Sequence, residues 1–403
     1  MPASGNLSAI ADSPGLQNLL VLASAQAVFV SGSILFITIG GIVGTLLAPD
    51  PSLATLPASL MVVGTAAMTI PAAMLMRRIG RRAGFAISAA GGAGAAWLGS
   101  VALQNNSFSG FCIAALAIGA LMAFSQQFRF AAAESVNSAW VSRAISFVLL
   151  GSVVAALLGP TLVSASAAAD PDSPFHNGMR WLIGFYVAAA VIFLYFRDRL
   201  QVTTTEEARP PRPLREIIAQ PAYMVALVGG IVGQGVMTFV MTAAPISMHV
   251  ADGFSIDETA AVIRVHVLAM FLPSLVSGWM VARFGIRRMM WTGAACLLAT
   301  VCIGCMGHAY LHYWWSMVLL GLGWNLLYLG ASTQLVTTYR ANERFSAQAV
   351  NEFSVFGAAA IASLGAGSLL HAFGWTILLG VSLPALLLLA WVLLRPATPQ
   401  TGH

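Results

Sequence analysis

Twelve apolar runs, each close to the length of a membrane-spanning helix, constrain this chain more than any other feature. A helix needs about 20 predominantly apolar residues to cross the hydrocarbon core of a bilayer. The runs cover residues 19–47, 56–76, 84–104, 110–130, 144–166, 181–196, 222–249, 259–282, 289–307, 314–337, 347–371 and 376–394. They lack the strict alternation of apolar and polar residues that marks the strands of a membrane β-barrel. We therefore predict an all-α polytopic membrane protein with twelve transmembrane helices.

The composition excludes several other classes of protein. Only 8% of the 403 residues are charged, against about 25% in a soluble domain, so a sizeable domain outside the membrane is not expected. All 19 basic side chains are arginines, which excludes a Schiff-base lysine and a phosphate-binding loop with its lysine. No motif pairs a nucleophile with a base or clusters carboxylates around a metal. We expect no enzyme activity, no cofactor, no metal and no nucleic-acid partner.

The arginines also predict the orientation of the chain. If both termini are cytoplasmic, 16 of the 19 fall in inner segments, as the positive-inside rule requires. These are Arg77, Arg78, Arg81, Arg82, Arg143, Arg197, Arg199, Arg209, Arg212, Arg215, Arg283, Arg287, Arg288, Arg340, Arg344 and Arg395. A composition rich in Ala and Arg and free of Lys is typical of a GC-rich bacterial genome. We therefore expect a multi-pass protein of a bacterial cytoplasmic membrane.

The two halves of the sequence look like copies of one unit. A charged, proline-rich segment over 197–220 lies near the midpoint and reads as a cytoplasmic linker. Gln26 and Gln234 are 208 residues apart, and the Arg-rich turns that begin at Arg78 and Arg283 are 205 apart. Such duplications are typical of secondary transporters whose binding site lies between the repeats. We predict an N-terminal six-helix bundle over 1–196 and a C-terminal six-helix bundle over 221–403, related by pseudo-symmetry.

These turns resemble a motif of the major facilitator superfamily, and the resemblance extends over essentially the whole chain. The family pattern G-x-x-x-D-R-x-G-R-[RK] is matched in part in both halves. The matching residues are Arg78, Gly80, Arg81 and Arg82 in the first copy and Gly278, Arg283, Gly285 and Arg287 in the second. The acidic position is occupied by Arg77 and Ala282. The resemblance implies that the two loops help to latch the cytoplasmic side, whereas their arginines and glycines alone predict headgroup anchors and tight turns.

Glu352 is the carboxylate that we place well inside a helix. An ionisable side chain at this depth costs about 2.5–3.5 kcal/mol on insertion scales and therefore needs a reason. Desolvation disfavours its charged form, which suits a group that loads and releases protons for coupled transport. The alternative is a static cytoplasmic lock in which Glu352 pairs with Arg129 or with an arginine of an inner loop.

Arg129 lies near the end of the fourth helix on a polar stripe with Ser125 and Gln126. A buried arginine suits a clamp for an anionic solute, because its planar fork donates two hydrogen bonds to one group. A salt bridge from the fourth helix to the eleventh is the alternative, and a snorkelling arginine is a third. Glu134 points about 140° away from Arg129 on a helical wheel and is expected in the following loop.

Several uncharged polar residues complete the candidate solute site. In the resembled family, helices one, four, seven and ten line the cavity, which makes polar groups on these helices candidate contacts. They are Gln26, Gln234, Thr238, Trp324, Asn325 and Tyr328, in addition to Gln126 and Arg129. Hydrogen bonding between neighbouring helices is the alternative role for them.

His266, in the eighth helix, is a second candidate for proton coupling, because histidine titrates near physiological pH. The alternative is a histidine satisfied at a helix interface. Cys302, Cys305, His308 and His312 suggest a metal site, but the helix is expected to end near Gly307, so ordinary packing is the better interpretation.

These features predict a proton-coupled secondary transporter of a small organic solute that works by alternating access. Efflux of a drug or metabolite and uptake of a nutrient such as a vitamin or organic acid fit equally well, because the same scaffold serves both. The expected partners are the solute, protons and the lipid bilayer, and we expect a monomer. The alternative from another class is a non-transporting membrane sensor or assembly subunit with the same fold.

Overall fold

The computed structural model describes residues 14–50, 53, 56–169, 174–198 and 210–395, and the regular structure in these ranges is helical. The helices of the first half are α2 (Pro14–Leu47), α3 (Leu56–Ile79), α4 (Arg81–Gln104), α5 (Phe108–Ser125), α6 (Phe128–Glu134), η2 (Ser138–Trp140), α7 (Val141–Ala169) and α8 (Pro174–Phe193). Those of the second half are α9 (Leu214–Ile218), α10 (Pro221–Ile246), the π-helical η3 (Ser247–Ala251), α11 (Ile256–Phe271), α12 (Ser274–Phe284), α13 (Ile286–Cys305), α14 (Tyr310–Val336), α15 (Arg344–Gly380) and α16 (Leu383–Leu394).

The helices confirm the predicted twelve passes. Nine helical stretches in the described ranges are long and apolar enough to cross a membrane. One of them joins α5 to α6, and another joins α11 to α12 across Pro273, which has no backbone N–H to continue the helix. The last stretch, Arg344–Leu394, contains two passes, because Gly374 (φ 77°) interrupts α15. With α8 and α14 the number is twelve.

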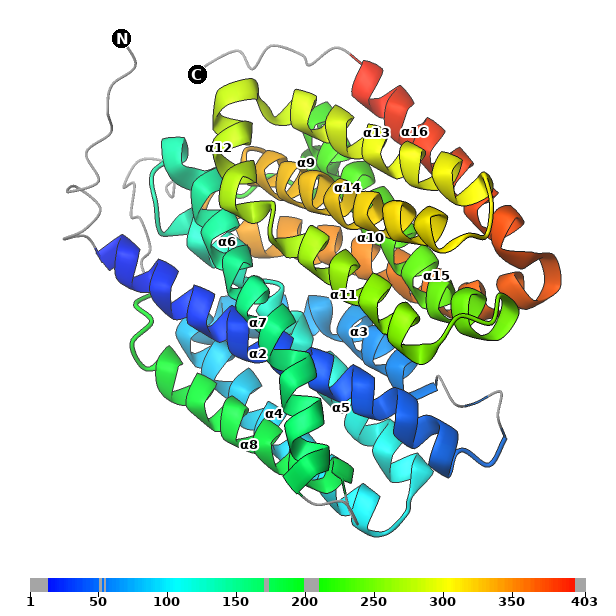
Figure 1. The fold of residues 1–403 in the computed structure, drawn as a ribbon. Helices are drawn as coiled ribbons and strands as arrows, with labels where there is room; N and C mark the ends of the chain where they lie inside the picture. Colours follow the sequence, from blue (N-terminus) through cyan, green and yellow to red (C-terminus); the bar gives the residue numbers. More distant parts are fainter. Residues whose placement is uncertain (1–13, 51–52, 54–55, 170–173, 199–209, 396–403) are drawn as a thin grey trace.

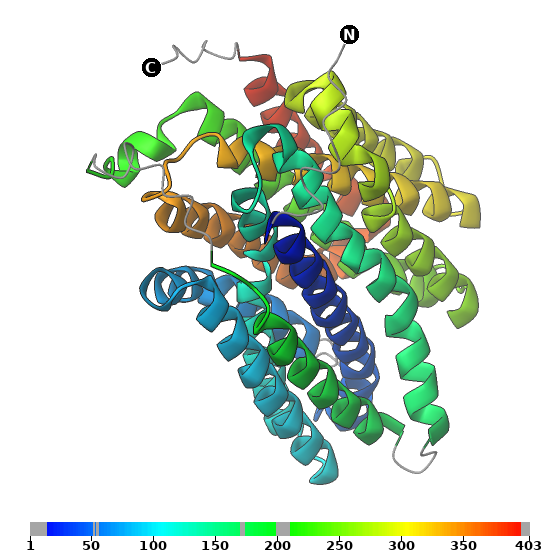
Figure 2. The same ribbon diagram turned by 90° about the vertical axis from the view of Figure 1, so that its left-hand side faces the viewer.

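The helices form two bundles with matching internal packing. Figures 1 and 2 show the N-terminal helices, in blue to green, and the C-terminal helices, in green to red, as two groups lying side by side. In the first bundle α2 packs against α7, α3 against α5 and α4 against α8. The equivalent pairs in the second bundle are α10 with α15, α11 with α14 and α13 with α16. Between the bundles, α3 contacts α15 and α7 contacts α12.

The two motif turns have the same backbone geometry. Gly80, between α3 and α4, has φ 84° and ψ 162°, and Gly285, between α12 and α13, has φ 88° and ψ 154°. A residue with a side chain rarely adopts this conformation, so glycine permits both tight reversals. The preceding arginines, Arg78 and Arg283, are exposed. The paired turns agree with the duplication that the sequence predicts.

The last arginine of each motif caps the final helix of its bundle. Arg82 donates from Nη2 to the carbonyl oxygen of Leu194, just after α8, at 2.6 Å. Arg287 donates from Nη2 to the carbonyl oxygen of Leu393, in the last turn of α16. Carbonyl groups at the end of a helix lack partners within the helix, and a guanidinium group satisfies them. Arg82 and Arg287 therefore have a structural role that is repeated in both halves.

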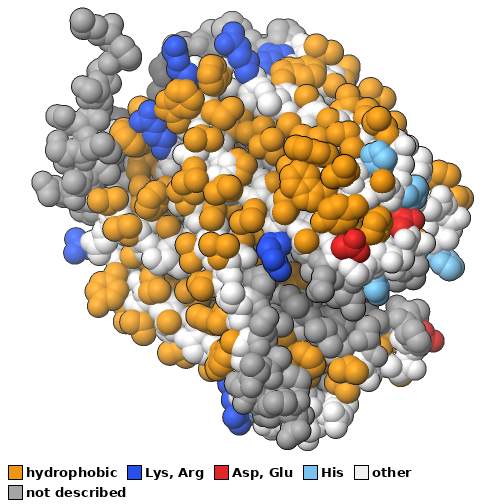
Figure 3. All heavy atoms as spheres, in the orientation of Figure 1, with side chains coloured by type: hydrophobic (Ala, Val, Ile, Leu, Met, Phe, Trp, Pro, Cys, Tyr) orange, Lys and Arg blue, Asp and Glu red, His pale blue; other side chains and the backbone are white. Residues whose placement is uncertain are grey.

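Charged side chains separate toward the two ends of the bundles. We call the end that carries Arg77, Arg82, Arg283 and Arg288 the arginine-rich end. Figure 3 shows apolar side chains over most of one face, with most of its basic side chains toward one end and its acidic and histidine side chains toward the other. This distribution is typical of a protein whose middle lies in lipid and whose ends lie in water.

Candidate functional site

A break between α5 and α6 places Arg129 at the boundary between the bundles. The helix is interrupted at Gln126 and Gln127, and Arg129 lies in the first turn of α6 with 4% of its surface exposed. Its guanidinium group packs over the rings of Phe130 (4.4 Å) and Tyr328 (4.3 Å). It also donates to the backbone oxygen of Gln126 at 3.1 Å. The charge is thus held between aromatic rings, away from water.

Arg129 forms a buried ion pair with Glu352 of the opposite bundle. Arg129 Nη2 lies 2.6 Å from Glu352 Oε1, and Glu352 is fully buried. Asn351 donates from Nδ2 to the same oxygen at 2.9 Å. Among the described residues, the other carboxylate oxygen, Oε2, has no hydrogen-bond partner. The pairing that the sequence offered as one alternative for each residue is therefore present as a contact between α6 and α15.

Tyr328 connects this ion pair to an aromatic wall. Its hydroxyl group accepts a hydrogen bond from Arg129 and donates to Gln126 Oε1 at 2.9 Å. Its ring stacks on that of Trp324, with centroids 4.7 Å apart and an interplanar angle of 19°. Both side chains belong to α14, where i and i+4 residues lie on one face. The result is a buried stack of two aromatic rings, with the guanidinium group of Arg129 over the ring of Tyr328.

The polar contacts continue from Trp324 into α10. Trp324 Nε1 donates to Gln234 Oε1 at 2.8 Å, and Gln234 Nε2 donates to Thr238 Oγ1 at 3.3 Å. Gln234 and Thr238 are partly buried. We use the term central cluster for Gln126, Arg129, Gln234, Thr238, Trp324, Tyr328, Asn351 and Glu352. Six of the eight solute contacts named from the sequence, and Glu352, lie in it; Asn351 is an addition.

The other candidates lie inside a single bundle. Gln26 donates to Ser152 Oγ at 3.0 Å and so joins α2 to α7. Asn325 is fully buried and donates to the backbone oxygen of Met270 at 2.7 Å. His266 is fully buried and its Nδ1 lies 2.8 Å from the backbone oxygen of Met317. These contacts join neighbouring helices, but the buried atoms Asn325 Oδ1 and His266 Nε2 have no hydrogen-bond partner among the described residues.

A second polar group joins the bundles at the arginine-rich end. Glu134 lies 2.8 Å from Arg81 Nη2 and 3.2 Å from Arg344 Nη1. Gln348 donates to Glu134 Oε1 at 3.1 Å and accepts from Arg81 at 3.0 Å. Arg81 and Arg344 both pack over the ring of Phe345. We call Arg81, Glu134, Arg344 and Gln348 the latch, because they tie α4 and α6 to the start of α15.

The latch corrects the expected position of Glu134. The sequence placed this residue in a loop, but it is the last residue of α6, because the break at Gln126 and Gln127 starts a new short helix. Glu134 supplies the carboxylate that is missing at the acidic position of the motif, which Arg77 occupies. The sequence did not show this pairing, because the burial of Arg81 (2% exposed) is known only from the structure.

Close backbone approach adds to the contact between the bundles. A side-chain carbon on Gly278 of α12 would lie 2.9 Å from the backbone oxygen of Ser142 and 2.7 Å from Ser146 Cβ, both in α7. Ser146 also donates to the backbone oxygen of Ser274 at 2.8 Å. Small residues at such crossings allow helices to touch through their backbones and to slide. Gly278 therefore serves the interface between the bundles rather than a turn.

The two histidines of the candidate metal site form other contacts. His308 Nδ1 lies 2.8 Å from Asp252 Oδ2, and His312 Nδ1 accepts a hydrogen bond from the backbone N–H of Ala309. Cys305 Sγ lies 3.8 Å from the backbone oxygen of Thr376. These contacts agree with packing roles.

An ion pair holds the end of the linker to the C-terminal bundle. Arg212 donates to Glu343 from Nε at 2.9 Å and from Nη2 at 2.6 Å, which makes a bidentate pair. The backbone N–H groups of Arg212 and Arg340 also donate to this carboxylate, at 2.9 Å each. Residues 199–209 of the predicted linker lie outside the described residues. The bidentate geometry is the strong form of this interaction.

The pairing with Arg212 predicts a stability change at acidic pH. Burial alone would raise the pKa of Glu343, but the hydrogen bonds from Arg212 and Arg340 outweigh it and lower the pKa from 4.5 to about 2. A carboxyl group whose pKa is lower in the folded protein than in the unfolded chain stabilises the fold at pH values above the unfolded pKa. This stabilisation is lost as the pH falls from the unfolded pKa to the folded pKa. Thermal unfolding should therefore show a loss between about pH 4.5 and 2 that Glu343→Gln lacks. Glu216→Gln, an exposed carboxylate on α9, should keep the loss; equal curves for all three proteins would contradict the assignment.

Comparisons with known proteins agree with this architecture. The family model described as Major Facilitator Superfamily matches residues 20–344 and 227–403. The chain is 37% identical over 361 residues to the riboflavin transporter RfnT of Brucella anthropi, covering 89% of this chain and 90% of that protein. It is 29% identical to the uncharacterized MFS-type transporter YddS of Bacillus subtilis, covering 84% and 82%.

Two solved structures have the same fold. The transporter FucP, crystallised in an outward conformation, matches with a TM-score of 0.72 at 13% identity, covering 94% of this chain and 99% of that one. The human organic anion transporter MFSD10 matches with a TM-score of 0.75 at 13% identity, covering 95% and 100%. At this level of identity the likeness concerns the fold alone.

Proposed function

The chain belongs to the major facilitator superfamily, and we propose that it is a proton-coupled secondary transporter of a small organic solute working by alternating access. The observation that carries the proposal is the ion pair between Arg129 and Glu352, which is buried where the two bundles meet. Such a pair is costly to desolvate and is weak evidence for stability as such. The desolvation cost of the pair supports a role in which the ion pair breaks and re-forms in each transport cycle.

Protonation of Glu352 is the step that we assign to coupling. A proton on Oε2, the oxygen without a hydrogen-bond partner among the described residues, removes the charge that holds Arg129. Arg129 then keeps its contacts with Gln126 and Tyr328 and is free to bind the solute. We assign no step to His266, whose contact with the backbone oxygen of Met317 joins α11 to α14 away from this ion pair.

We propose riboflavin, or a flavin close to it, as the first solute to test. The relative RfnT is a riboflavin transporter over nearly the full length of both chains. Riboflavin is a flat aromatic molecule with an imide edge, which suits a stacking surface beside hydrogen-bonding side chains. Trp324 and Tyr328 provide the aromatic rings, which are stacked on each other and buried in this state, and Gln234 and Gln126 accept hydrogen bonds from them. The central cluster supports this solute better than a bare ion.

We also propose the orientation and state of the molecule. The arginine-rich end faces the cytoplasm of a bacterial inner membrane, with both termini on that side, since basic residues remain inside. The latch and the contact at Gly278 then close the cytoplasmic side, so the molecule is in a state that is closed to the cytoplasm. The working unit is a monomer with bundles 1–196 and 221–403 joined by the linker 197–220.

Transport by purified protein in liposomes tests this proposal. With the outside two pH units more acidic than the inside, we expect riboflavin, followed by its own fluorescence, to accumulate in the liposomes. A protonophore should abolish the accumulation, and liposomes without protein provide the baseline. Accumulation that ignores the protonophore would contradict proton coupling. Riboflavin binding without movement in either direction would instead indicate a membrane sensor.

A further inference from the structure

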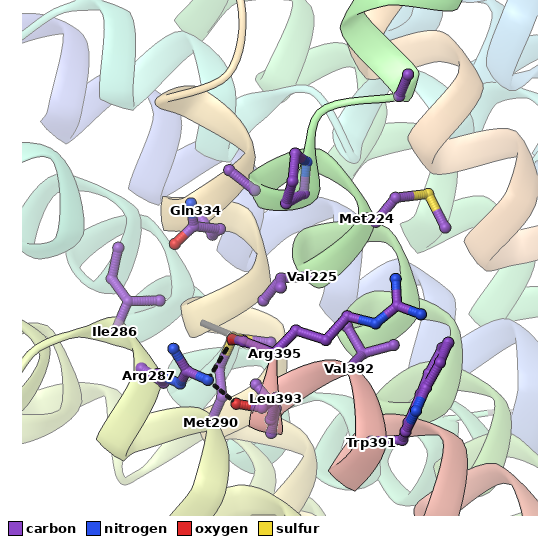
Figure 4. A pocket seen from close by; sticks show the side chains of 13 residues that line it. Met224, Val225, Ile286, Arg287, Met290, Gln334, Trp391, Val392, Leu393 and Arg395 are labelled. Atoms are coloured by element: carbon purple, nitrogen blue, oxygen red, sulfur yellow. Dashed lines mark hydrogen bonds between the residues drawn. The ribbon is translucent and has the colours of Figure 1, made fainter. Parts of the chain in front are cut away.

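A pocket of about 550 Å³ opens at the arginine-rich end of the C-terminal bundle, and none of the residues of the central cluster line it. It lies where α10 and α13 begin and where α14 and α16 end (Figure 4). Met224, Met290 and Val392 contribute to its apolar wall, and Arg287 and Arg395 line it as well. The size is that of a small-molecule site. The function proposed above makes no use of this pocket.

The two arginines give the pocket a positive charge. Arg287 donates from Nη2 to the backbone oxygens of Leu393 and Arg395, and these bonds fix it beside the end of α16 (Figure 4). The guanidinium group of Arg395 lies 3.6 Å from the ring centroid of Trp391. Among the described residues, those that line the pocket include no aspartate or glutamate. The helix ends here are two N-termini and two C-termini, which offset each other, so the arginines decide the sign of the charge.

The N-terminal bundle has the corresponding place filled with aromatic rings. The ring of Phe85, in the first turns of α4, lies 4.9 Å from that of Phe128 and 5.3 Å from that of Phe193. Phe196, just after α8, completes the group at 5.6 Å from Phe85. All four side chains are buried. This half of the duplication is therefore packed solid at its arginine-rich end.

The C-terminal bundle lacks these rings. The offset of 205 residues that relates Gly80 to Gly285 places Met290 where the first bundle has Phe85. The capped carbonyl groups belong to Leu194 and Leu393, which are 199 residues apart. This offset makes Arg395 the equivalent of Phe196. A flexible side chain and a charged one thus replace two rings that fill space. The pocket is a specific difference between the two copies.

We propose that this pocket binds one anionic phospholipid, with its phosphate on Arg287 and Arg395 and an acyl chain along the apolar wall. A lipid fits better than a soluble anion, because the pocket adjoins side chains on the outside of the bundle. Trp391 is 54% exposed and Met224 39% exposed, and both line the pocket. Basic pockets between helices at this depth recognise anionic headgroups, and exposed tryptophans mark the same level of the bilayer.

Thermal unfolding of the full chain in a neutral detergent tests the proposal. Phosphatidylglycerol should raise the unfolding midpoint of the wild type, and phosphatidylcholine should not. Arg395→Gln, which changes an exposed side chain, should weaken the apparent affinity for phosphatidylglycerol about fivefold. Ala222→Leu, which fills the wall of the pocket without changing its charge, should remove most of the stabilisation. Arg287 is unsuitable for this test, because it also caps α16.

Arg283→Gln is the matched control, since this arginine is exposed on α12 and does not line the pocket. It should respond to phosphatidylglycerol as the wild type does. The proposal is wrong if Arg395→Gln and Ala222→Leu keep the full response, or if Arg283→Gln loses as much as Arg395→Gln. A midpoint shift of the same size with inorganic phosphate alone would also overturn it, because a lipid chain would then be unnecessary.

Discussion

Replacing Glu352 by glutamine is expected to abolish proton-driven accumulation of the solute while leaving exchange between equal solute pools. Glutamine has nearly the same shape but cannot gain or lose the proton that releases Arg129 from Glu352 Oε1. A gradient of two pH units sustains about a hundredfold accumulation for one proton per neutral solute, since each unit is worth about 1.4 kcal/mol. In Glu352→Gln this ratio should fall to about one. Uptake into liposomes with and without the gradient measures it.

Glu216→Gln provides the control for this substitution. The chemical change is the same, but Glu216 is exposed on α9 and lies outside the central cluster. This variant should accumulate solute as the wild type does. If Glu352→Gln also accumulated solute normally at every pH, the ion pair would be a static lock, and another group would have to carry the proton.

The helices of this protein could be predicted from the sequence because each must be long enough to cross the hydrocarbon core of the bilayer. Every backbone polar group must be satisfied inside the membrane, so an apolar run of sufficient length becomes a helix. The breaks are less visible. Pro273 marks the division between α11 and α12 in the sequence, whereas the interruption at Gln126 and Gln127 contains no proline or glycine that would indicate it. That interruption starts α6 and thereby decides where Arg129 and Glu134 lie.

The pairing of Arg129 with Glu352 could be named only as one of several alternatives. The two residues are 223 positions apart, and helical periodicity says nothing about which helices of different bundles touch. The sequence did show that few charged residues occur inside apolar runs, and each of them needs a partner. The contact between α6 and α15 identifies the partners as Arg129 and Glu352. Asn351 also contacts the Glu352 carboxylate, because it precedes Glu352 in the same helical turn.

Polar residues without charge were harder to place. Gln26 and Gln234 occupy equivalent positions in the two repeats, yet Gln26 bonds to Ser152 of its own bundle and Gln234 bonds to Trp324 in the central cluster. His266 is another example, since its burial between α11 and α14 depends on which face of the helix turns inward. A helix surrounded by apolar neighbours carries little sequence signal for that rotation.

Replacing Arg129 by leucine is expected to lower the stability of the protein by about 3–5 kcal/mol. The change leaves Glu352 fully buried without the cation that compensates its charge, and breaking a buried pair from one side has a cost of this size. Tyr328 loses the guanidinium group over its ring as well. The thermal midpoint in detergent should fall by about 4–6 °C. Arg78→Leu, at an exposed arginine of the motif, should change it little.

The double variant Arg129→Leu, Glu352→Leu separates a structural role from a functional one. Replacing both partners of a buried pair by apolar residues is often neutral or stabilising, so the midpoint should return to within a few degrees of the wild type. Accumulation driven by the pH gradient should nevertheless stay absent, because no group remains at this position to bind the proton or the solute. A double variant that is stable and transports normally would show that the pair only holds α6 against α15.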